Sequence, residues 1–355
     1  MKITVIGAGN GGQAIAGFCA IKGHEVRLFD IDSEKVNELR LLGNIKLRGK
    51  IKGSGVITLI TNDIKKAVKD AELIFIVTTA NAHKTLAKQL APLIQEGQII
   101  ILSPGRTCGA LEFRQTVIEQ GCTRHFYLAE AQTLVYACRL IKNGEVNIIG
   151  IKDEVLLSAL PSSDTSHILH IVRPIYECFT PAKNVLQTSL ENIGAIFHPC
   201  VLLFNAATIE RKSDFYFYRD MTPQIAHFIE AFDAERLAVG KAYGIQLIGA
   251  SDWISYAYKG TTGDTLCEKM RNNPAYYDIK APSSIYTRQL MEDIPTGVLP
   301  IMELGKAAGL SMCLFESMIN ICSSLLNINF TKDGRTLISL GLNELNKEEI
   351  LSSIQ

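Results

Sequence analysis

The chain has 355 residues, with 36 Lys and Arg, 36 Asp and Glu, a formal net charge of +0 and 47% hydrophobic residues. A chain of this length usually forms two domains or one large one. Zero net charge with this apolar content excludes a chain-wide basic surface for nucleic acid or anionic lipid, and it excludes general disorder. We therefore expect a globular protein that binds neither nucleic acid nor membranes.

The nine cysteines are scattered, without a Cys-x-x-Cys pair, and their number is odd. This pattern is poor for a disulfide framework or a zinc cage and is typical of reduced, mostly buried thiols. Residues 1–7 run directly into a strand pattern without the features of a signal peptide, and no apolar run reaches the ~18 residues of a membrane span. The sequence thus predicts a cytoplasmic protein without a metal site.

Up to about residue 151, short apolar runs alternate with helical patterns, as in a parallel sheet covered by helices. The predicted strands are residues 3–6, 26–29, 73–77, 99–102, 126–128 and 148–151. Residues 44–61 interrupt this order and resemble a hairpin insertion, with strands at 45–49 and 56–59. The sequence does not indicate a role for this insertion.

After Pro181, apolar residues recur three and four positions apart and β-branched runs become rare, which favours helices. The predicted helices are residues 187–209, 222–243, 284–293, 298–308 and 311–326. No repeat or flexible linker separates the two halves. We therefore predict an α/β domain with a parallel sheet at residues 1–183, followed by an all-α domain at residues 184–355.

The sharpest motif is Gly7-Ala8-Gly9-Asn10-Gly11-Gly12, which stands between the first strand and a helical pattern at 13–21. Gly7 is suited to a tight turn, Gly9 to close approach of a pyrophosphate, and Gly12 to close packing of helix on strand. The N-terminus of the helix that follows would offer free N–H groups and a positive dipole end to the phosphates, and Asn10 in the motif is a further candidate for binding the cofactor. This context predicts a Rossmann-type domain that binds a dinucleotide.

The second predicted strand ends in Asp30, an acid that can accept hydrogen bonds from ribose hydroxyls and repel a 2′-phosphate. The next residue is Ile31. An Arg at this position would bind the 2′-phosphate of NADP, so the sequence favours NAD over NADP. Two alternatives stay open. Asp30 could cap the next helix, although Asp32 and Ser33 are also suited to capping, and a flavin would use the same glycine motif.

In the second half, Pro199 directly follows His198 inside a predicted helix. Pro199 cannot donate to Ala195 and crowds its carbonyl, so we expect the helix to kink or restart at His198. Gly194 and Ala195 lie one turn earlier on the same face and would leave room for a ligand. Imidazole is the usual proton carrier near neutral pH. From this segment alone, however, a core histidine that only fixes the kink is the simpler interpretation.

A second polar group of interest lies at residues 286–297, where a helical pattern meets Pro295 and Gly297 and is predicted to end. Arg288 could bind a carboxylate with two hydrogen bonds, and Asp293 could orient an imidazolium. From spacing alone, a solvated Arg and an acid in a helix-ending turn remain the simpler interpretation.

With these residues the chain resembles the octopine/nopaline dehydrogenase family, the opine dehydrogenases, and among them the bacterial norvaline-type members. The segments that carry the resemblance cover nearly the whole chain: 109–114, 184–199, 233–236, 273–276, 287–293 and 334–337. The resemblance implies a Rossmann domain followed by a helical domain. It also implies reductive condensation of an α-keto acid, often pyruvate, with the amine of an L-amino acid through an imine, with NAD(P)H as hydride donor.

The resemblance assigns the family's catalytic His and Asp to His198 and Asp293, and its carboxylate-binding Arg to Arg288. It assigns a polar substrate position at a strand end to Thr133, although residues 129–132 depart from the family pattern. Two carboxylates on an opine require cationic or polar anchors, of which Arg288 is one. The norvaline-type likeness favours a neutral, apolar amino acid.

Two other functions compete with this interpretation. Carbonyl reductases of the ketopantoate or glycerol-3-phosphate type rely on a Lys from the first helices of the second domain, and residues 188–205 contain no Lys. A non-catalytic NAD-binding sensor or scaffold would require His198, Arg288 and Asp293 to lie apart. The pattern is compatible with a homodimer but fixes neither the oligomeric state nor the physiological direction of the reaction.

Overall fold

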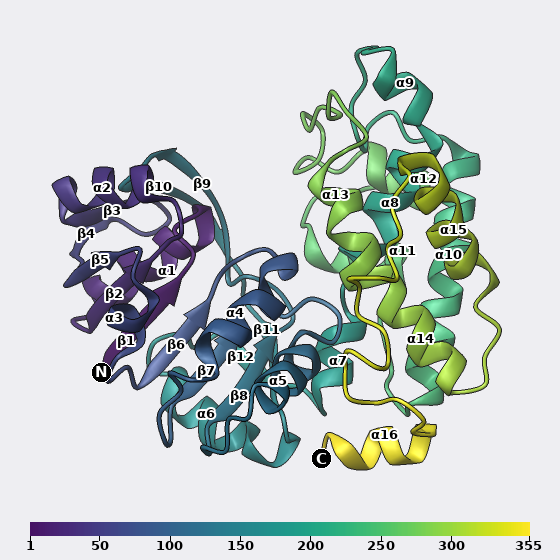
Figure 1. Cartoon of the computed structure of the whole chain (residues 1–355). Helices are drawn as coiled ribbons and strands as arrows, with labels where there is room; N and C mark the ends of the chain where they lie inside the picture. Colours follow the sequence, from purple (N-terminus) through teal and green to yellow (C-terminus); the bar gives the residue numbers. More distant parts are fainter. The chain divides into compact units, whose positions relative to one another are not determined.

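A computed structural model describes residues 1–355, and the chain divides into two compact units. The first unit contains Met1–Ser189 together with Ser352–Gln355, and the second contains Leu190–Leu351. The sheets belong to the first unit, and the later, green to yellow part of the chain is helical (Figure 1). The predicted order, an α/β Rossmann-type domain and then an all-α domain, is confirmed.

The first unit is built on an eight-stranded sheet with the order β12-β11-β8-β7-β6-β1-β2-β5. The six strands from β8 to β5 are parallel, whereas β11 pairs antiparallel with β8. Every residue of β6 and β7 is buried, which explains their continuous apolar runs. The strands are β1 (Lys2–Ile6), β2 (Glu25–Phe29), β5 (Leu59–Thr61), β6 (Leu73–Ile76), β7 (Ile99–Leu102), β8 (Tyr127–Ala131), β11 (Val155–Ala159) and β12 (Phe179–Pro181).

Helices connect these strands, and local signals set their ends. The Asp32 carboxylate accepts from the backbone N–H of Glu34 and Lys35 at the start of α2, and Gly43, with φ of 66°, ends that helix. The α-helices of this part are α1 (Asn10–Ile21), α2 (Ser33–Leu42), α3 (Ile64–Val68), α4 (His83–Leu90), α5 (Gly109–Glu119), α6 (Thr165–Val172) and α7 (Val185–Leu190).

A second sheet of four strands, in the order β4-β3-β10-β9, packs against α1. Its strands are β3 (Asn44–Gly49), β4 (Gly53–Val56), β9 (Tyr136–Lys142) and β10 (Glu145–Ile151). A Cβ on Gly55 would lie 2.5 Å from the Gly17 carbonyl oxygen of α1, so the strand approaches the helix backbone directly. The insertion at 44–61 therefore helps to cover the helix that follows the glycine motif.

Two strand predictions are wrong in this region. The predicted strand at 148–151 belongs to the second sheet, where β10 pairs with β3 and β9, and not to the parallel sheet. The hairpin exists as β3 and β4, but its second strand is Gly53–Val56, while Leu59–Thr61 joins the main sheet beside β2. Local apolar patterning marks a strand but does not choose between two sheets in which it could be buried.

The second unit contains no strand beyond one isolated bridge between Tyr216 and Lys280. None of its helices is long and apolar enough to cross a membrane, and no group of three His, Cys, Asp or Glu side chains could hold a metal ion. The helices are α8 (Gly194–Phe204), α9 (Ala206–Glu210), α10 (Pro223–Ala242), α11 (Ala250–Ala257), α12 (Leu266–Arg271), α13 (Arg288–Met291), η3 (Ile294–Val298, a π-helix), α14 (Leu299–Ala307), α15 (Cys313–Leu326) and α16 (Lys347–Ser353).

The predicted helices at 222–243, 298–308 and 311–326 are confirmed as α10, α14 and α15. The predicted helix at 187–209 is instead divided into α7, α8 and α9, and only α13 forms within 284–293. We expected the helix to kink or restart at His198. Pro199 lies inside α8, so the restart is wrong, and the kink stays a prediction. Phe197, Cys200 and Val201 around Pro199 are buried, and their packing offsets the missing backbone hydrogen bond.

The first unit continues to Ser189, beyond the boundary predicted after residue 183. The hydroxyls of Thr188 and Ser189 donate to Oε1 of the buried Glu130 at 2.6 and 2.8 Å, and Ala110 N–H donates to Oε2 at 2.8 Å. The end of the chain also returns, because Ser162 N–H donates to the Ile354 carbonyl at 2.9 Å. Polar contacts thus determine that residues 184–189 and 352–355 belong to the first unit. Such contacts leave no hydrophobic pattern in the sequence, so the boundary could not be predicted from it.

Candidate active site

The glycine motif forms the turn between β1 and α1 at the carboxyl edge of the main sheet. Gly7 has φ of +102°, and a Cβ on it would lie 2.7 Å from the Val77 carbonyl oxygen. A Cβ on Gly12 would lie 1.6 Å from the Gly7 carbonyl oxygen, whereas one on Gly9 would meet nothing within 4 Å. The backbone therefore requires Gly7 and Gly12, and the open space at Gly9 fits the approach of a pyrophosphate.

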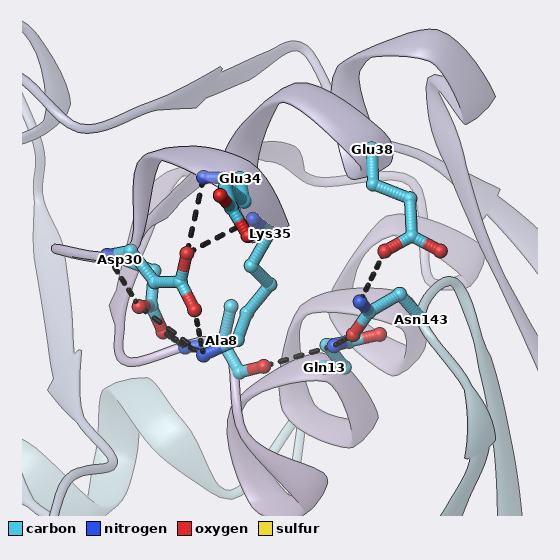
Figure 2. A network of polar contacts seen from close by, with 8 residues as sticks. Ala8, Gln13, Asp30, Glu34, Lys35, Glu38 and Asn143 are labelled. Carbon is cyan, nitrogen blue, oxygen red and sulfur yellow. Dashed lines mark hydrogen bonds and ion pairs between the residues drawn. The ribbon is translucent and has the colours of Figure 1, made fainter.

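The helix start at Asn10 has no side-chain cap, so its first N–H groups can receive a phosphate. The Asn10 side chain has another partner, because its Oδ1 accepts from Leu140 N–H of β9 at 3.0 Å. Buried Gln13 donates to the Ala8 carbonyl at 2.8 Å (Figure 2). Its side-chain oxygen accepts from Gly144 N–H at 2.8 Å. The second sheet thus fixes the glycine turn, a role of Gln13 that sequence reasoning missed.

Asp30, directly after β2, also contacts the glycine turn, through Ala8 (Figure 2). Its carboxylate accepts from Ala8 N–H at 2.7 Å and Asp32 N–H at 3.0 Å, and the Lys35 ammonium lies 3.3 Å from both oxygens. Since Asp32 caps α2, the capping alternative for Asp30 is wrong. Lys35 was not anticipated, and it partly neutralises the charge that would repel a 2′-phosphate.

A hollow of about 410 Å³ lies next to Asp30 in the first unit. Ile31, which is 80% exposed, lies on its wall with other apolar side chains that could contact a purine ring. The hollow is lined by Phe29, Ile31, Asn62, Ile64, Lys65, Gln89, Pro92 and Leu93. Together with the glycine turn and Asp30, these residues fit a bound adenine dinucleotide.

Thr133 follows β8 and has a lysine partner. The Lys152 ammonium donates to Thr133 Oγ1 at 2.5 Å, and Lys152 N–H donates to the Val135 carbonyl at 3.0 Å. Burial first, and the nearby positive charge of Arg106 second, lower the pKa of Lys152 to about 8. Sequence reasoning missed Lys152, because the turn that carries it leaves the second sheet.

In the second unit, His198 and Asp293 form a hydrogen-bonded pair, with Nδ1 of the imidazole 2.6 Å from Oδ2 of the carboxylate. The Asp293 side chain is 3% exposed and the His198 side chain 26%. A carboxylate accepts, so Nδ1 donates and Nε2 is the ring atom left to exchange a proton with a substrate. The simpler interpretation of Asp293, an acid in a helix-ending turn, is therefore wrong.

Close packing of α8 on η3 produces this pair. Ala195 is fully buried, and a Cβ on Gly297 would lie 2.7 Å from the Ala195 Cβ. Ala195 therefore serves packing, not the ligand space predicted for it. The chain also does not leave helical structure at Pro295 and Gly297, because η3 leads directly into α14. Single turns of π-helix are frequent at functional sites.

Arg288 begins α13, and its Nε donates to the carboxylate of Glu292 one turn later. The Arg288 side chain is 59% exposed while that of Glu292 is 1% exposed, so the acid fixes an arginine that otherwise faces solvent. The remaining guanidinium N–H groups can bind a carboxylate. The scaffold alternative required the three residues to lie apart, which the contact of His198 with Asp293 contradicts.

Aromatic side chains, which the sequence did not single out, extend from His198. The Phe217 ring lies 6.2 Å from the imidazole and 4.7 Å from Tyr218, measured between ring centroids. Tyr218 in turn stacks on Tyr276 at 4.3 Å. The surroundings of the imidazole in this unit are therefore partly aromatic.

Two family models match the chain. The model described as NAD/NADP octopine/nopaline dehydrogenase, alpha-helical domain, matches residues 181–326. The model described as NAD-dependent glycerol-3-phosphate dehydrogenase N-terminus matches residues 2–129. The two matches correspond to the helical and the sheet-bearing parts of the chain.

Relatives and solved structures agree with these models. An opine dehydrogenase of Arthrobacter sp. (strain 1C) is 36% identical over 99% of this chain and 98% of its own length. The octopine dehydrogenase of Pecten maximus is 22% identical over 94% of this chain and 92% of its own length. A structure of octopine dehydrogenase with NADH and L-arginine matches with a TM-score of 0.83 and 20% identity, covering 100% of this chain and 98% of that one.

The full-length similarity to the Arthrobacter enzyme and the match of the helical domain agree with the geometry of both units. The first unit has the glycine turn and terminal acid of an NAD(H)-binding domain, and the second has a histidine fixed by a buried acid. The chain therefore belongs to the octopine/nopaline dehydrogenase family, the opine dehydrogenases, and is an oxidoreductase that acts on CH–NH bonds.

Proposed function

We propose that this enzyme uses NADH to condense a small α-keto acid, with pyruvate as the first candidate, with the amine of a neutral, apolar L-amino acid. The amine and the keto group form an imine with loss of water. The imine carbon then takes a hydride and the nitrogen takes a proton. The observation that carries the proposal is the 2.6 Å contact between His198 and Asp293. It supplies an oriented proton carrier, which this reduction requires.

His198 acts as the acid and base. Reduction of an imine develops charge on nitrogen, so a proton donor must lie beside that atom. With Nδ1 held by Asp293, Nε2 gives a proton to the product amine, and it takes a proton back when the reaction runs in reverse. Asp293 holds the ring in this tautomer and stabilises its protonated form by charge.

The remaining site residues bind the cofactor and the substrates. The bound NADH supplies the hydride, and Gly7, Gly9, Gly12, the backbone of Asn10, and Asp30 would hold it. Arg288, oriented by Glu292, binds a carboxylate of the substrates through its outer N–H groups. Thr133 contributes a hydroxyl at the strand end of the first unit.

Two observations support pyruvate and an apolar amino acid. Pyruvate is the ligand in a structure of octopine dehydrogenase with TM-score 0.80 to this chain. The aromatic side chains near His198 offer apolar contact surface, and none of them offers a carboxylate to pair with a basic side chain, so an apolar amino acid is favoured.

The test is NADH oxidation with pyruvate in the presence and absence of each L-amino acid. We expect turnover only when an amine is present, with the highest kcat/KM for neutral, apolar amino acids. NADH oxidation by the keto acid alone would indicate a carbonyl reductase of the ketopantoate or glycerol-3-phosphate type. A marked preference for Arg or Lys would contradict the apolar assignment.

The catalytic assignment has its own test. His198→Ala should lower kcat by ~10²- to 10⁴-fold, the usual effect of removing a positioned acid or base. The affinity for NADH should stay near wild type. His227→Ala, which removes an exposed imidazole from α10, serves as the matched control. Normal turnover of His198→Ala would disprove the assignment.

A further inference from the structure

The first unit contains a partly buried positive charge, the ammonium of Lys152, that the proposed function has not used. The one hydrogen-bond acceptor of the Lys152 ammonium is Thr133 Oγ1 at 2.5 Å. No carboxylate forms an ion pair with it, and the acids that follow in the chain, Asp153 and Glu154, are exposed. An ammonium has three donors, so two N–H groups of Lys152 remain to be satisfied.

A second positive charge lies nearby. Arg106, in the turn after β7, is close enough for its charge to disfavour protonation of Lys152. Both side chains contribute positive electrostatic potential at this place, and a positive potential favours a negatively charged ligand.

The position of the pair agrees with a ligand site. β7 and β8 are parallel, so Arg106 and Thr133 follow their strands at the same carboxyl edge. Lys152 precedes β11, which is antiparallel to β8 and therefore begins at that edge. Open α/β sheets bind their ligands at this edge.

The pair also borders the dinucleotide turn. Leu134, the residue after Thr133, lies so near the glycine motif that a Cβ on Gly11 would be 2.8 Å from its Cδ2. Thr133 is thus the chain neighbour of a residue whose side chain packs against the glycine motif.

We propose that Lys152 and Thr133 form the binding site for the carboxylate of the α-keto acid, with Arg106 adding positive potential. The inference rests on the proposed function, in which two carboxylates need anchors and Arg288 supplies only one. Thr133 accepts from Lys152 and so directs its own hydroxyl proton elsewhere, where it can donate to a carboxylate oxygen. The ligand class is a small α-keto monocarboxylate.

The test measures pyruvate binding by calorimetry on the NADH-bound enzyme without an amino acid. Lys152→Met should weaken pyruvate binding by about 10- to 100-fold, the usual effect of losing a charged hydrogen-bond partner. Lys152→Arg should restore part of it. Lys142→Met, which removes an exposed lysine of β9, is the matched control and should bind pyruvate as wild type does.

Stability distinguishes a binding role from a structural one. Because Lys152→Met removes a partly buried charge that has no carboxylate partner, its Tm should equal or exceed that of the wild type while pyruvate binding falls. Thr133→Val provides a second variant that keeps the lysine, and it should weaken pyruvate binding without changing the affinity for NADH.

Several results would overturn the site. These are unchanged pyruvate binding in Lys152→Met, no pyruvate binding to the wild-type NADH complex, or joint loss of NADH binding, pyruvate binding and Tm. Pyruvate binding that depends on Lys152 without any amine-dependent turnover would support the site and contradict the proposed function alone.

Discussion

Ala195 of α8 and Gly297 of η3 face each other so closely that a Cβ on Gly297 would lie 2.7 Å from the Cβ of Ala195. His198 lies one turn after Ala195, and Asp293 lies one turn before Gly297. The approach of these two small residues therefore sets the distance between the imidazole and its carboxylate.

Gly297→Ala should separate the two helices. We expect a loss of about 1–3 kcal/mol in the free energy of unfolding, as for other overpacked sites. We also expect kcat to fall by up to ~10²-fold, because a displacement of about 1 Å can cost that much. Thermal unfolding and steady-state kinetics measure the two effects. The double variant Ala195→Gly/Gly297→Ala moves the methyl group to the opposite helix and should recover both, and failure to recover would contradict this explanation.

Gly9 and Gly12 should respond differently to the same substitution. Gly12→Ala places a Cβ 1.6 Å from a backbone oxygen, so we expect little folded protein. Gly9→Ala meets no protein atom within 4 Å, and its Tm should stay near wild type. Its affinity for NADH should nevertheless fall by about tenfold or more, roughly 1.4 kcal/mol, because the methyl group enters the pyrophosphate space. Equal NADH affinity in Gly9→Ala would show that the phosphates lie elsewhere.

Asp30 and Lys35 should set the selectivity between NADH and NADPH in opposite directions. Asp30→Asn keeps an acceptor but removes the charge, so the ratio of NADPH to NADH affinity should rise by about tenfold or more. Lys35→Met removes the cation 3.3 Å from that carboxylate and should lower the same ratio. Calorimetric dissociation constants of both nucleotides measure it. If the affinity ratio shifted in the same direction in both variants, the opposite roles assigned to Asp30 and Lys35 would be wrong.

Pyruvate binding should depend on pH through Lys152. Burial first, and the charge of Arg106 second, lower the pKa of Lys152 to about 8 from its ordinary 10.5, while Cys178 acts weakly in the opposite direction. The protonated form binds the carboxylate, so affinity should be fully present below about pH 8 and should be lost as the pH rises through that value. Lys152→Arg, whose side chain keeps its proton, should show a flat profile over pH 7 to 9 in the same titration, roughly the range around this pKa. A wild-type profile as flat as that of Lys152→Arg would contradict the role of the ammonium.

The glycine turn and Asp30 could be predicted from the sequence because each reflects a local demand. A left-handed φ at Gly7 and a close approach at Gly12 leave a mark in the residues themselves. The roles of Lys35 and Gln13 leave no such mark in the sequence, because a lysine or glutamine on a helix is common and its role depends on a partner that the sequence does not identify. The assignment of Asp30 was therefore made without the cation that modifies it.

The second unit shows a different limit of prediction from the sequence. Spacing indicated neither that His198 and Asp293 meet nor that α8 continues through Pro199, and the pairing was expected from family resemblance alone. The contact joins residues 95 positions apart, and it depends on a packing of α8 on η3 that periodicity does not encode. Lys152 was missed for a related reason, because the strand that precedes it was assigned to the wrong sheet.

The contacts of Glu130 determine where the chain can be divided into separately produced domains. A separately produced dinucleotide-binding half that stopped at residue 183 would keep the buried carboxylate and lose the two hydroxyls that solvate it. A half that stopped at Ser189 would retain them. It would still expose the backbone amide of Ser162 that the last residues of the chain satisfy, so adding the peptide 352–355 should protect it from proteolysis.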